Sequence, residues 1–549
     1  MEKYKVKRMK WNFLKAFRML LPITLFVVLL LTLLISLATT FFSEINKQAL
    51  IEVFSDEQIL HVILFTIKQA LISTVATIII AIPIARAIHR RKFFFGRSII
   101  IKVISLSFVV PSVVLVLGLA EIHGTNGWIN KFLALFNLSF KQYLYGFSGI
   151  ILGHITFNIP IAVRIFLNKL DAIPDDTWKL ATNLGFSSYR IFKNIEKPIL
   201  KIAITQVFTI IFIISFTSFV IVLDLGANPA NTSMEVAIYQ ALRFEFDISK
   251  AVILCVLQFV ICLILMLFVS RGQYSPIFLK TTYNIHFHRP DLKNKFEIMI
   301  DYFFILLTCI IIILPIIAIG KAGFNSGLLR LFYNEEFWKA FGYSIFIALS
   351  SGILSIIFAA SIMSGVFYFK YIQKNNTMLR ITSLISNFTI ILSPYIIGTG
   401  LFIIFKPSIN LFFVGKYILI LINALLVLPF VISILINPII SFPIKKIWLC
   451  RNLNIKSYDF FRLIIWREIR KYVAYALSIA ITLSWGDFSI IALFGNEDFI
   501  TLPYLLNYNM SNYNTSDAAN ISFVMLFLAF LLIWIVEEFI GGAENVKIK

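Results

Sequence analysis

Charged side chains are scarce in this sequence, and their scarcity excludes a water-soluble globule. Asp, Glu, Lys and Arg make up 14% of the 549 residues, whereas hydrophobic residues make up 59%. A chain with so little polar surface cannot cover a folded domain in water, and lipid must cover the rest. The composition therefore predicts a membrane protein, and the long apolar runs described below predict an all-α one.

Acidic residues and cysteines are scarcer still. The chain has 28 Asp plus Glu against 49 Lys plus Arg. The basic residues lie in short segments between apolar runs, as membrane topology requires and nucleic-acid binding does not. The four cysteines form no Cys-x-x-Cys pair, so we expect neither a disulfide nor a bound metal. They are Cys255, Cys262, Cys309 and Cys450.

Twelve apolar runs are long enough to span a membrane, which takes about 20 mostly apolar residues. They lie near 20–40, 62–84, 99–120, 145–167, 200–223, 250–270, 299–319, 342–367, 381–405, 414–436, 472–494 and 520–541. The first run is longer than the apolar core of a secretory signal, and eleven more follow it. We therefore expect it to remain as the first span.

Lysine and arginine are distributed unevenly between alternate loops. With a cytoplasmic N-terminus, the inside segments hold 37 of the 49 basic residues and the outside loops hold ten. Basic residues near the ends of spans resist translocation. The sequence therefore predicts a multi-pass protein of the bacterial inner membrane with both termini in the cytoplasm.

The chain contains an internal repeat with a constant offset, which places spans four and five on spans ten and eleven. The identical pairs at this repeat offset are Pro160 with Pro429, Ser215 with Ser484, Phe219 with Phe488, Gly226 with Gly495, Thr232 with Thr501, and Tyr239 with Tyr508. An even number of spans separates the copies, so both have the same orientation. We expect two tandem six-helix halves, 1–285 and 286–549, around a pseudo-twofold axis with a path between them.

Two long cytoplasmic loops, within 168–200 and 440–470, fall on each other in this repeat. In the first, Pro174 suits the start of a short helix, and Gly185 suits the left-handed residue that ends it. Ser187 or Ser188 can then cap a second helix. The second loop has Asn454 in place of Gly185. One such loop is compatible with a solvated connector, but two in register favour a helix, a turn and a helix along the membrane surface.

Both loops resemble the E-A-A-x3-G-x9-I-x-L-P motif of permeases in ATP-binding-cassette (ABC) importers. The matching positions are Lys179, Leu180, Ala181, Gly185, Ile195 and Pro198 in the first loop, and Trp448, Leu449, Cys450, Asn454 and Ile464 in the second. Both copies lack the glutamate of the motif, and the second also lacks its glycine and proline. The resemblance implies that each turn docks into a groove on a cytoplasmic ABC ATPase and transmits its movement.

Two further segments are similar to thiamine and thiamine-pyrophosphate import permeases. They are SFTSFVIVLDLGANPANTSMEVAIYQALRFEFD at 215–247 and GDFSIIALFGNEDFITLP at 486–503. The similarity extends over most of the chain and is weakest in the N-terminal part and in spans seven to nine. It implies a fused type I ABC importer permease for thiamine or its phosphate esters, with a periplasmic thiamine-binding protein and an ATPase dimer that holds ATP and Mg²⁺. The chain itself is expected to bind no cofactor and to be no enzyme.

Polar side chains deep in a span are costly and often functional. His154 and Asn158 lie in the fourth span, and Asn423 matches His154 in the tenth. Asp487 lies toward the outer end of the eleventh. We name these four as candidates for the translocation path. The alternative is packing through hydrogen bonds to a neighbouring helix for the first three, and hydration or helix capping for Asp487.

Other classes of transporter fit the sequence less well. An ion-coupled secondary transporter can also have two parallel halves, but it normally keeps more ionisable groups inside its spans. A channel or membrane-bound enzyme would need a filter or a catalytic cluster, which we do not find. The chain also has no phosphate-binding loop, as expected if a partner hydrolyses ATP. A ferric-iron or polyamine ABC permease of similar layout remains the alternative within the class.

The difference between the two loops leads to a test. Gly185→Val should impair ATP-coupled uptake more than Asn454→Gly, because a β-branched residue does not tolerate the left-handed conformation that glycine adopts. Uptake by the reconstituted transporter is the measurement. Equal losses in the two variants would contradict the proposed turn at Gly185.

Overall fold

The structure is a computed structural model of the chain. It describes residues 51, 55–138 except 93, 95 and 108, 142–269 except 227 and 228, 289–378 except 374 and 376, 391–405, 411–441, 452, 453, 459, and 461–541 except 496–498. The predicted first span near 20–40 lies outside these residues, as does the start of the predicted ninth span.

Nine helical segments in the described part of the chain are long and apolar enough to cross a membrane. They contain α3 (Glu57–Arg90), α7 (Phe147–Asp171), α10 (Lys197–Phe216), α13 (Ile248–Val269), α14 (Lys295–Gly323), α16 (Glu335–Phe367), α19 (Leu411–Ile440), α22 (Trp466–Trp485) and α25 (Thr515–Gly541). Each of these helices overlaps one of the predicted apolar runs. The all-α prediction is therefore confirmed for the residues that the structure describes.

Shorter helices connect the long ones. The α-helices among them are α4 (Arg97–Ser107), α5 (Ser112–His123), α6 (Trp128–Ala134), α8 (Asp175–Asn183), α9 (Ser188–Ile191), α11 (Val220–Gly226), α12 (Met234–Gln240), α15 (Gly327–Leu331), α18 (Pro394–Phe405), α23 (Ser489–Phe494) and α24 (Leu502–Ser511). The 3-10 and π segments are η1 (Phe192–Glu196), η2 (Pro229–Asn231), η3 (Ala241–Glu245), η4 (Pro290–Lys293), η5 (Tyr368–Gln373) and η6 (Phe461–Ile465).

The predicted third span, near 99–120, is not one helix but two. It divides into α4 and α5, and Pro111 stands at the N-cap of α5. Proline has no backbone N–H to donate and disfavours helical geometry in the residue before it, so a continuous helix is interrupted there.

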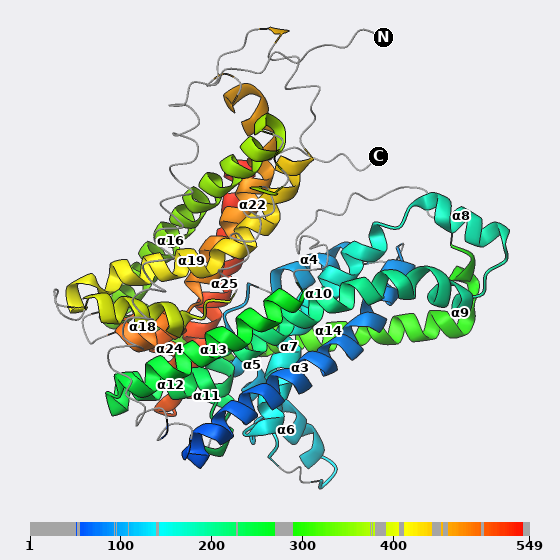
Figure 1. The fold of residues 1–549 in the computed structure, drawn as a ribbon. Helices are drawn as coiled ribbons and strands as arrows, with labels where there is room; N and C mark the ends of the chain where they lie inside the picture. The colour runs from blue at the N-terminus through cyan, green and yellow to red at the C-terminus, as the bar shows by residue number, and fades with distance from the viewer. Residues whose placement is uncertain are drawn as a thin grey trace.

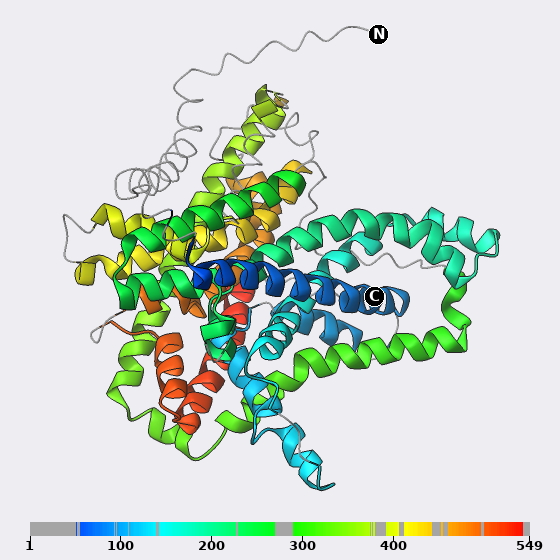
Figure 2. The same ribbon diagram turned by 60° about the horizontal axis from the view of Figure 1, so that its bottom comes forward.

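The long helices form two bundles that diverge at one end and meet at the other (Figure 1). The first contains α3, α7 and α10, and the second contains α16, α19, α22 and α25. Helix α14 packs against α3 and α5 and also against α25, and Figure 2 shows it running along the first bundle. The first long helix of the second predicted half therefore packs against the first half.

Helices α12 and α24, the second short helices after α10 and α22, begin with the same kind of hydrogen bond. The backbone N–H of Met234, at the start of α12, donates to the hydroxyl of Thr66 on α3 at 2.9 Å. The N–H of Leu502, at the start of α24, donates to the hydroxyl of Ser344 on α16 at 2.8 Å. The first N–H groups of a helix have no partner within it. In α12 and in α24, a hydroxyl group on a long helix accepts a hydrogen bond from one of these N–H groups.

Two of the predicted spans are interrupted near one end, at matching positions. Helix α10 ends at Phe216 and α11 begins at Val220, while α22 ends at Trp485 and α23 begins at Ser489. The π segments η1 and η6, which precede α10 and α22, are related by the same repeat offset. The offset found in the sequence therefore relates helix boundaries as well as residue identities.

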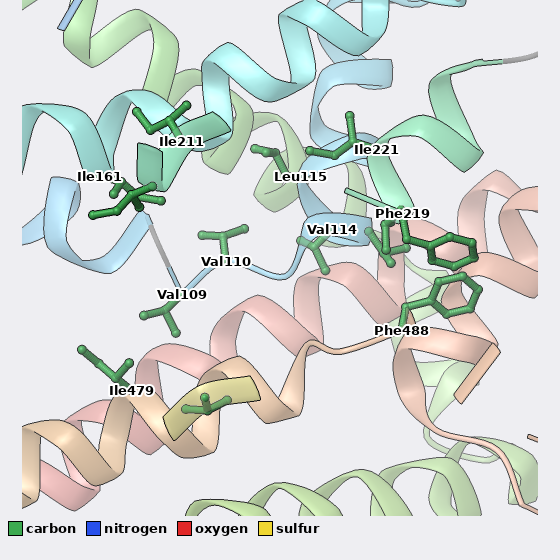
Figure 3. Close-up of a cluster of buried hydrophobic side chains, with 14 of the residues drawn as sticks. Val109, Val110, Val114, Leu115, Ile161, Ile211, Phe219, Ile221, Ile479 and Phe488 are labelled. Carbon is green, nitrogen blue, oxygen red and sulfur yellow. The ribbon is translucent and has the colours of Figure 1, made fainter. Parts of the chain in front are cut away.

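A buried apolar cluster joins the two bundles near these interruptions (Figure 3). Val109 and Val110, just before α5, lie on the side of α22 that carries Ile479, and Phe219 lies next to Phe488. Gly486, in the second interruption, closely approaches Pro111, since an added Cβ atom would lie 2.7 Å from the proline ring.

This close approach predicts a stability defect. Gly486→Ala should destabilise the protein by about 1–3 kcal/mol, the usual effect of overpacking a well-packed core. Thermal unfolding of the purified protein in detergent measures it. Gly342→Ala on α16 is the control, because a Cβ atom there meets nothing within 4 Å. Equal stability of the two variants would contradict a tight contact at Gly486.

Candidate coupling loop and buried ion cluster

The first of the two long loops, within 168–200, has the predicted turn. Gly185 has a positive φ of 60°, and the N–H of Phe186 donates to the carbonyl of Ala181 at 3.0 Å. This is the left-handed closure by which glycine ends a helix. Helix α9 starts at Ser188 after Ser187, but the side chain of Ser187 makes no capping hydrogen bond. The helix, turn and second helix predicted around Gly185 are confirmed.

The loop presents apolar side chains on its outer surface. Leu180, Leu184 and Tyr189 are 61%, 64% and 70% exposed, whereas Ala181 and Trp178 are buried against the bundle. Lys179 is also exposed and forms an ion pair with Asp176 at 3.0 Å. Exposed apolar groups gathered on one short loop are typical of a surface that binds a partner. Trp448, Cys450 and Asn454 of the second loop lie outside the described residues.

Beneath this loop lies a cluster of ion pairs that we call the buried ion cluster. Its members are Arg86, Arg90, Arg91, Glu196, Arg289, Asp291, Glu297 and Asp301. Four guanidinium groups face four carboxylates, so the charges within the cluster balance. They come from the end of α3, from η1, from the linker before α14 and from α14 itself.

Arg289, in the linker between the predicted halves, contacts three parts of this region. Its guanidinium lies 2.8 Å from Glu196 and 2.7 Å from Asp291. It also lies over the ring of Trp178 on α8, 4.7 Å from the ring centroid, where the π-electron face attracts a cation. Helix α8 of the candidate coupling loop is thereby attached to the linker that leads into α14.

Arg289 and Asp291 in the linker keep each other ionised. Burial alone would raise the pKa of Asp291, but hydrogen bonds to Arg289 and the charge of that residue hold the pKa below its ordinary value. Burial alone would lower the pKa of Arg289, and the hydrogen bond to Asp291 and the charge of Glu196 raise it above its ordinary value. Both groups stay ionised at neutral pH, as paired buried charges do.

The second half has no such residues at the corresponding positions. When the first residues of α3 and α16, Glu57 and Glu335, are aligned, Arg86 corresponds to Ser364. At the repeat offset, Glu196 corresponds to Ile465. At these two described positions the second half therefore lacks the charges that tie the first loop to the linker.

The predicted path residues lie in two different surroundings. His154 on α7 is buried and hydrogen-bonded to Ser73 on α3 at 3.1 Å, and Asn158 donates to Ser215 on α10 at 3.0 Å. These contacts fall within the first bundle, as the packing alternative requires. Asn423 on α19 is also buried. A role of these three residues in the path stays a prediction.

Asp487 lies in the interruption between α22 and α23, where it accepts a hydrogen bond from the N–H of Ile490 at 3.4 Å. This bond satisfies one N–H in the first turn of α23, and a role of Asp487 in the path stays a prediction. Close to it lie groups that the sequence analysis did not name as candidates for the path, namely Glu235 and the rings of Phe219 and Phe488.

The buried ion cluster was also missed from the sequence. Its arginines were counted as ordinary basic residues of cytoplasmic segments. The signal available was the presence of Glu196 and Asp291 in segments rich in arginine and lysine, since an acidic residue among so many cations is suited to pairing with one of them.

Comparison with known proteins places these features in a family. Residues 74–275 match the protein family described as "Binding-protein-dependent transport system inner membrane component". The chain is 35% identical to the thiamine transport system permease protein ThiP of Haemophilus influenzae, covering 87% of this chain and 88% of that protein. It is 33% identical to ThiP of Escherichia coli, covering 90% and 92%. A crystal structure of a bacterial ABC transporter for alginate aligns with a TM-score of 0.42 at 17% identity, over 47% of this chain and 94% of that one, a likeness too distant to add to the assignment.

The chain is thus a permease component of a binding-protein-dependent transport system. Within that class it belongs to the family of the thiamine transport system permease protein ThiP. The predictions of a multi-pass inner-membrane permease and of a transport subunit with no catalytic reaction of its own are confirmed by these relatives.

The buried ion cluster predicts a large effect of removing one partner. Arg289→Met should lower the free energy of unfolding by about 3–5 kcal/mol, because Glu196 and Asp291 are left buried without their cation. Denaturant unfolding of the purified protein measures this loss. Lys339→Met is the control, since its ion pair with Glu335 is exposed and such pairs contribute little to stability. A loss for Arg289→Met no larger than for the control would contradict the cluster.

Proposed function

We propose that this chain is the permease of an ABC importer that moves thiamine or its phosphate esters across the bacterial inner membrane. The observation that carries the proposal is the 35% identity to ThiP of Haemophilus influenzae over most of both chains. Similarity limited to a short motif would support the class of permease and leave the substrate open.

The partners of this chain are an ATPase dimer in the cytoplasm and a periplasmic thiamine-binding protein. The ATPase docks on the first coupling loop, where Leu180, Leu184 and Tyr189 are exposed, and on its counterpart in 440–470. ATP and Mg²⁺ are bound by the ATPase, and the permease binds no cofactor. The match to a binding-protein-dependent transport family supports both partners.

The twelve spans are arranged as two six-helix halves, 1–285 and 286–549, with both termini in the cytoplasm. The matched interruptions after α10 and α22 and the equivalent hydroxyl contacts of Thr66 and Ser344 support the repeat. The bundles diverge toward the end of the first bundle that carries α8 and meet at the opposite end (Figure 1). This arrangement fits a permease closed toward the outside and open toward the cytoplasm.

Movement of the first coupling loop is passed to the second half through the buried ion cluster. Trp178 on α8 contacts Arg289, and Arg90 joins Asp291 to Asp301 on α14 at 3.3 and 3.1 Å. A packed chain of charges transmits displacement better than a solvated loop, because breaking any pair leaves a buried charge uncompensated.

Reconstitution tests the function directly. The chain, its ATPase and its binding protein in proteoliposomes should accumulate labelled thiamine when ATP is present, and vanadate should stop the uptake. Uptake that resists vanadate and collapses with an uncoupler would contradict an ATP-driven importer. Uptake of ferric iron or a polyamine without thiamine would retain the class and replace the substrate.

A further inference from the structure

Five aromatic side chains meet where the two bundles join, and we call them the inter-half aromatic cluster. They are Phe219 and Tyr239 from the first predicted half, and Tyr395, Phe488 and Tyr504 from the second. Phe219 and Phe488 stack across the junction, with ring centroids 6.0 Å apart and planes inclined by 17° (Figure 3). The ring of Tyr395 meets Phe219 edge-on at 4.9 Å.

Both phenylalanines occupy the interruptions of the long helices. Phe219 directly precedes α11, and Phe488 directly precedes α23, at equivalent positions of the repeat. Their backbones are therefore not locked into a long helix, and their rings face each other at the junction of the halves. Separation of the halves would expose both ring faces together.

Two carboxyl groups lie beside this cluster. Glu235 lies one helical turn before Tyr239 on α12, and Asp487 directly precedes Phe488. The hydroxyl of Tyr395 donates to the carbonyl of Ser489, two residues after Asp487, at 2.9 Å. Glu235 is fully buried. Its Oε1 accepts a hydrogen bond from Gln258 at 2.6 Å, while Oε2 has no partner of good geometry in the described part of the chain, although the Ser393 hydroxyl is close.

Neither carboxyl group forms an ion pair with a described residue. Arg243, a cation whose charge acts on Tyr239, instead donates a hydrogen bond to the carbonyl of Gly495 at 3.3 Å. Burial of the Glu235 carboxyl group without a paired cation disfavours its charged form, and a cation placed beside it would remove that cost. Carboxylates beside stacked rings form an environment suited to a flat organic cation, which the faces of the rings attract.

We propose that the inter-half aromatic cluster, together with Glu235 and Asp487, is a transient binding site for the thiazolium cation of thiamine as it passes between the halves. This inference rests on the proposed function, which supplies the substrate. In the closed structure the rings seal the junction, and when the halves part, the ring faces and both carboxylates become available to the cation. Binding must stay weak so that the substrate can leave.

Charge selectivity tests the proposal. Uptake is measured with the complete transporter for thiamine and for an isostere in which a neutral aromatic ring replaces the thiazolium ring. Glu235→Gln and Asp487→Asn should each lower the ratio of thiamine to isostere uptake about tenfold, equivalent to about 1.4 kcal/mol, since only the cation loses an attraction. The binding protein is the same throughout, so its own preference cancels.

Glu336→Gln is the matched control. Glu336 is an exposed carboxylate at the start of α16, and its loss should leave the ratio unchanged. If Glu235→Gln fails to fold, Asp487→Asn and equilibrium binding of thiamine to the purified permease in lipid nanodiscs carry the test.

The outcomes distinguish failure of the proposed cation site from failure of the proposed function. Equal slowing of thiamine and the isostere, or an unchanged ratio, would overturn the cation site and leave only a seal between the halves. Absence of thiamine uptake by the unmodified transporter would instead overturn the proposed function, and the inference with it.

Discussion

The structure depends on one constraint, which is that a backbone N–H or C=O group inside a bilayer must find its partner within the protein. Long α-helices meet this constraint for most of the described chain. Where helices stop, other parts of the protein supply the partners. The side chain of Gln69 on α3, for instance, donates to the carbonyl of Ser215 in the last turn of α10 at 2.8 Å.

The same constraint explains where the irregular backbone lies. The interruptions at Pro111, before Val220 and before Ser489 lie against the other half, where Gly486 meets Pro111 and Phe219 meets Phe488. Non-helical backbone is tolerated at membrane depth when protein covers it. The residues that form the junction between the two bundles are therefore concentrated where the long helices are interrupted.

The two ends of the molecule use different interactions for different purposes. The junction of the bundles is apolar and aromatic, so it can close tightly and separate without leaving many charges unpaired. The end that carries α8 is held by charges, and breaking any pair there leaves a buried ion without its partner. The apolar junction can part at little electrostatic cost, whereas the end that carries α8 resists separation of its ion pairs.

Much of this could be predicted from the sequence because it depends on local or periodic patterns. Apolar runs mark spans whatever packs against them, and the closure at Gly185 needs only a residue that tolerates positive φ. The repeat offset correctly related the helix boundaries around α10 and α22. The interruption at Pro111 was missed, although proline is a local signal, because the apolar run continues through it.

The sequence by itself determined the membrane character of this protein, the location of most spans and the turn of the first coupling loop, since each follows from the chemistry of neighbouring residues. Only the tertiary structure decided that Arg289 joins Glu196 and Trp178, and that Phe219 and Phe488 lie face to face beside Glu235 and Asp487. These contacts connect residues that are far apart along the chain. No local pattern encodes such a pairing, because it depends on how complete helices pack.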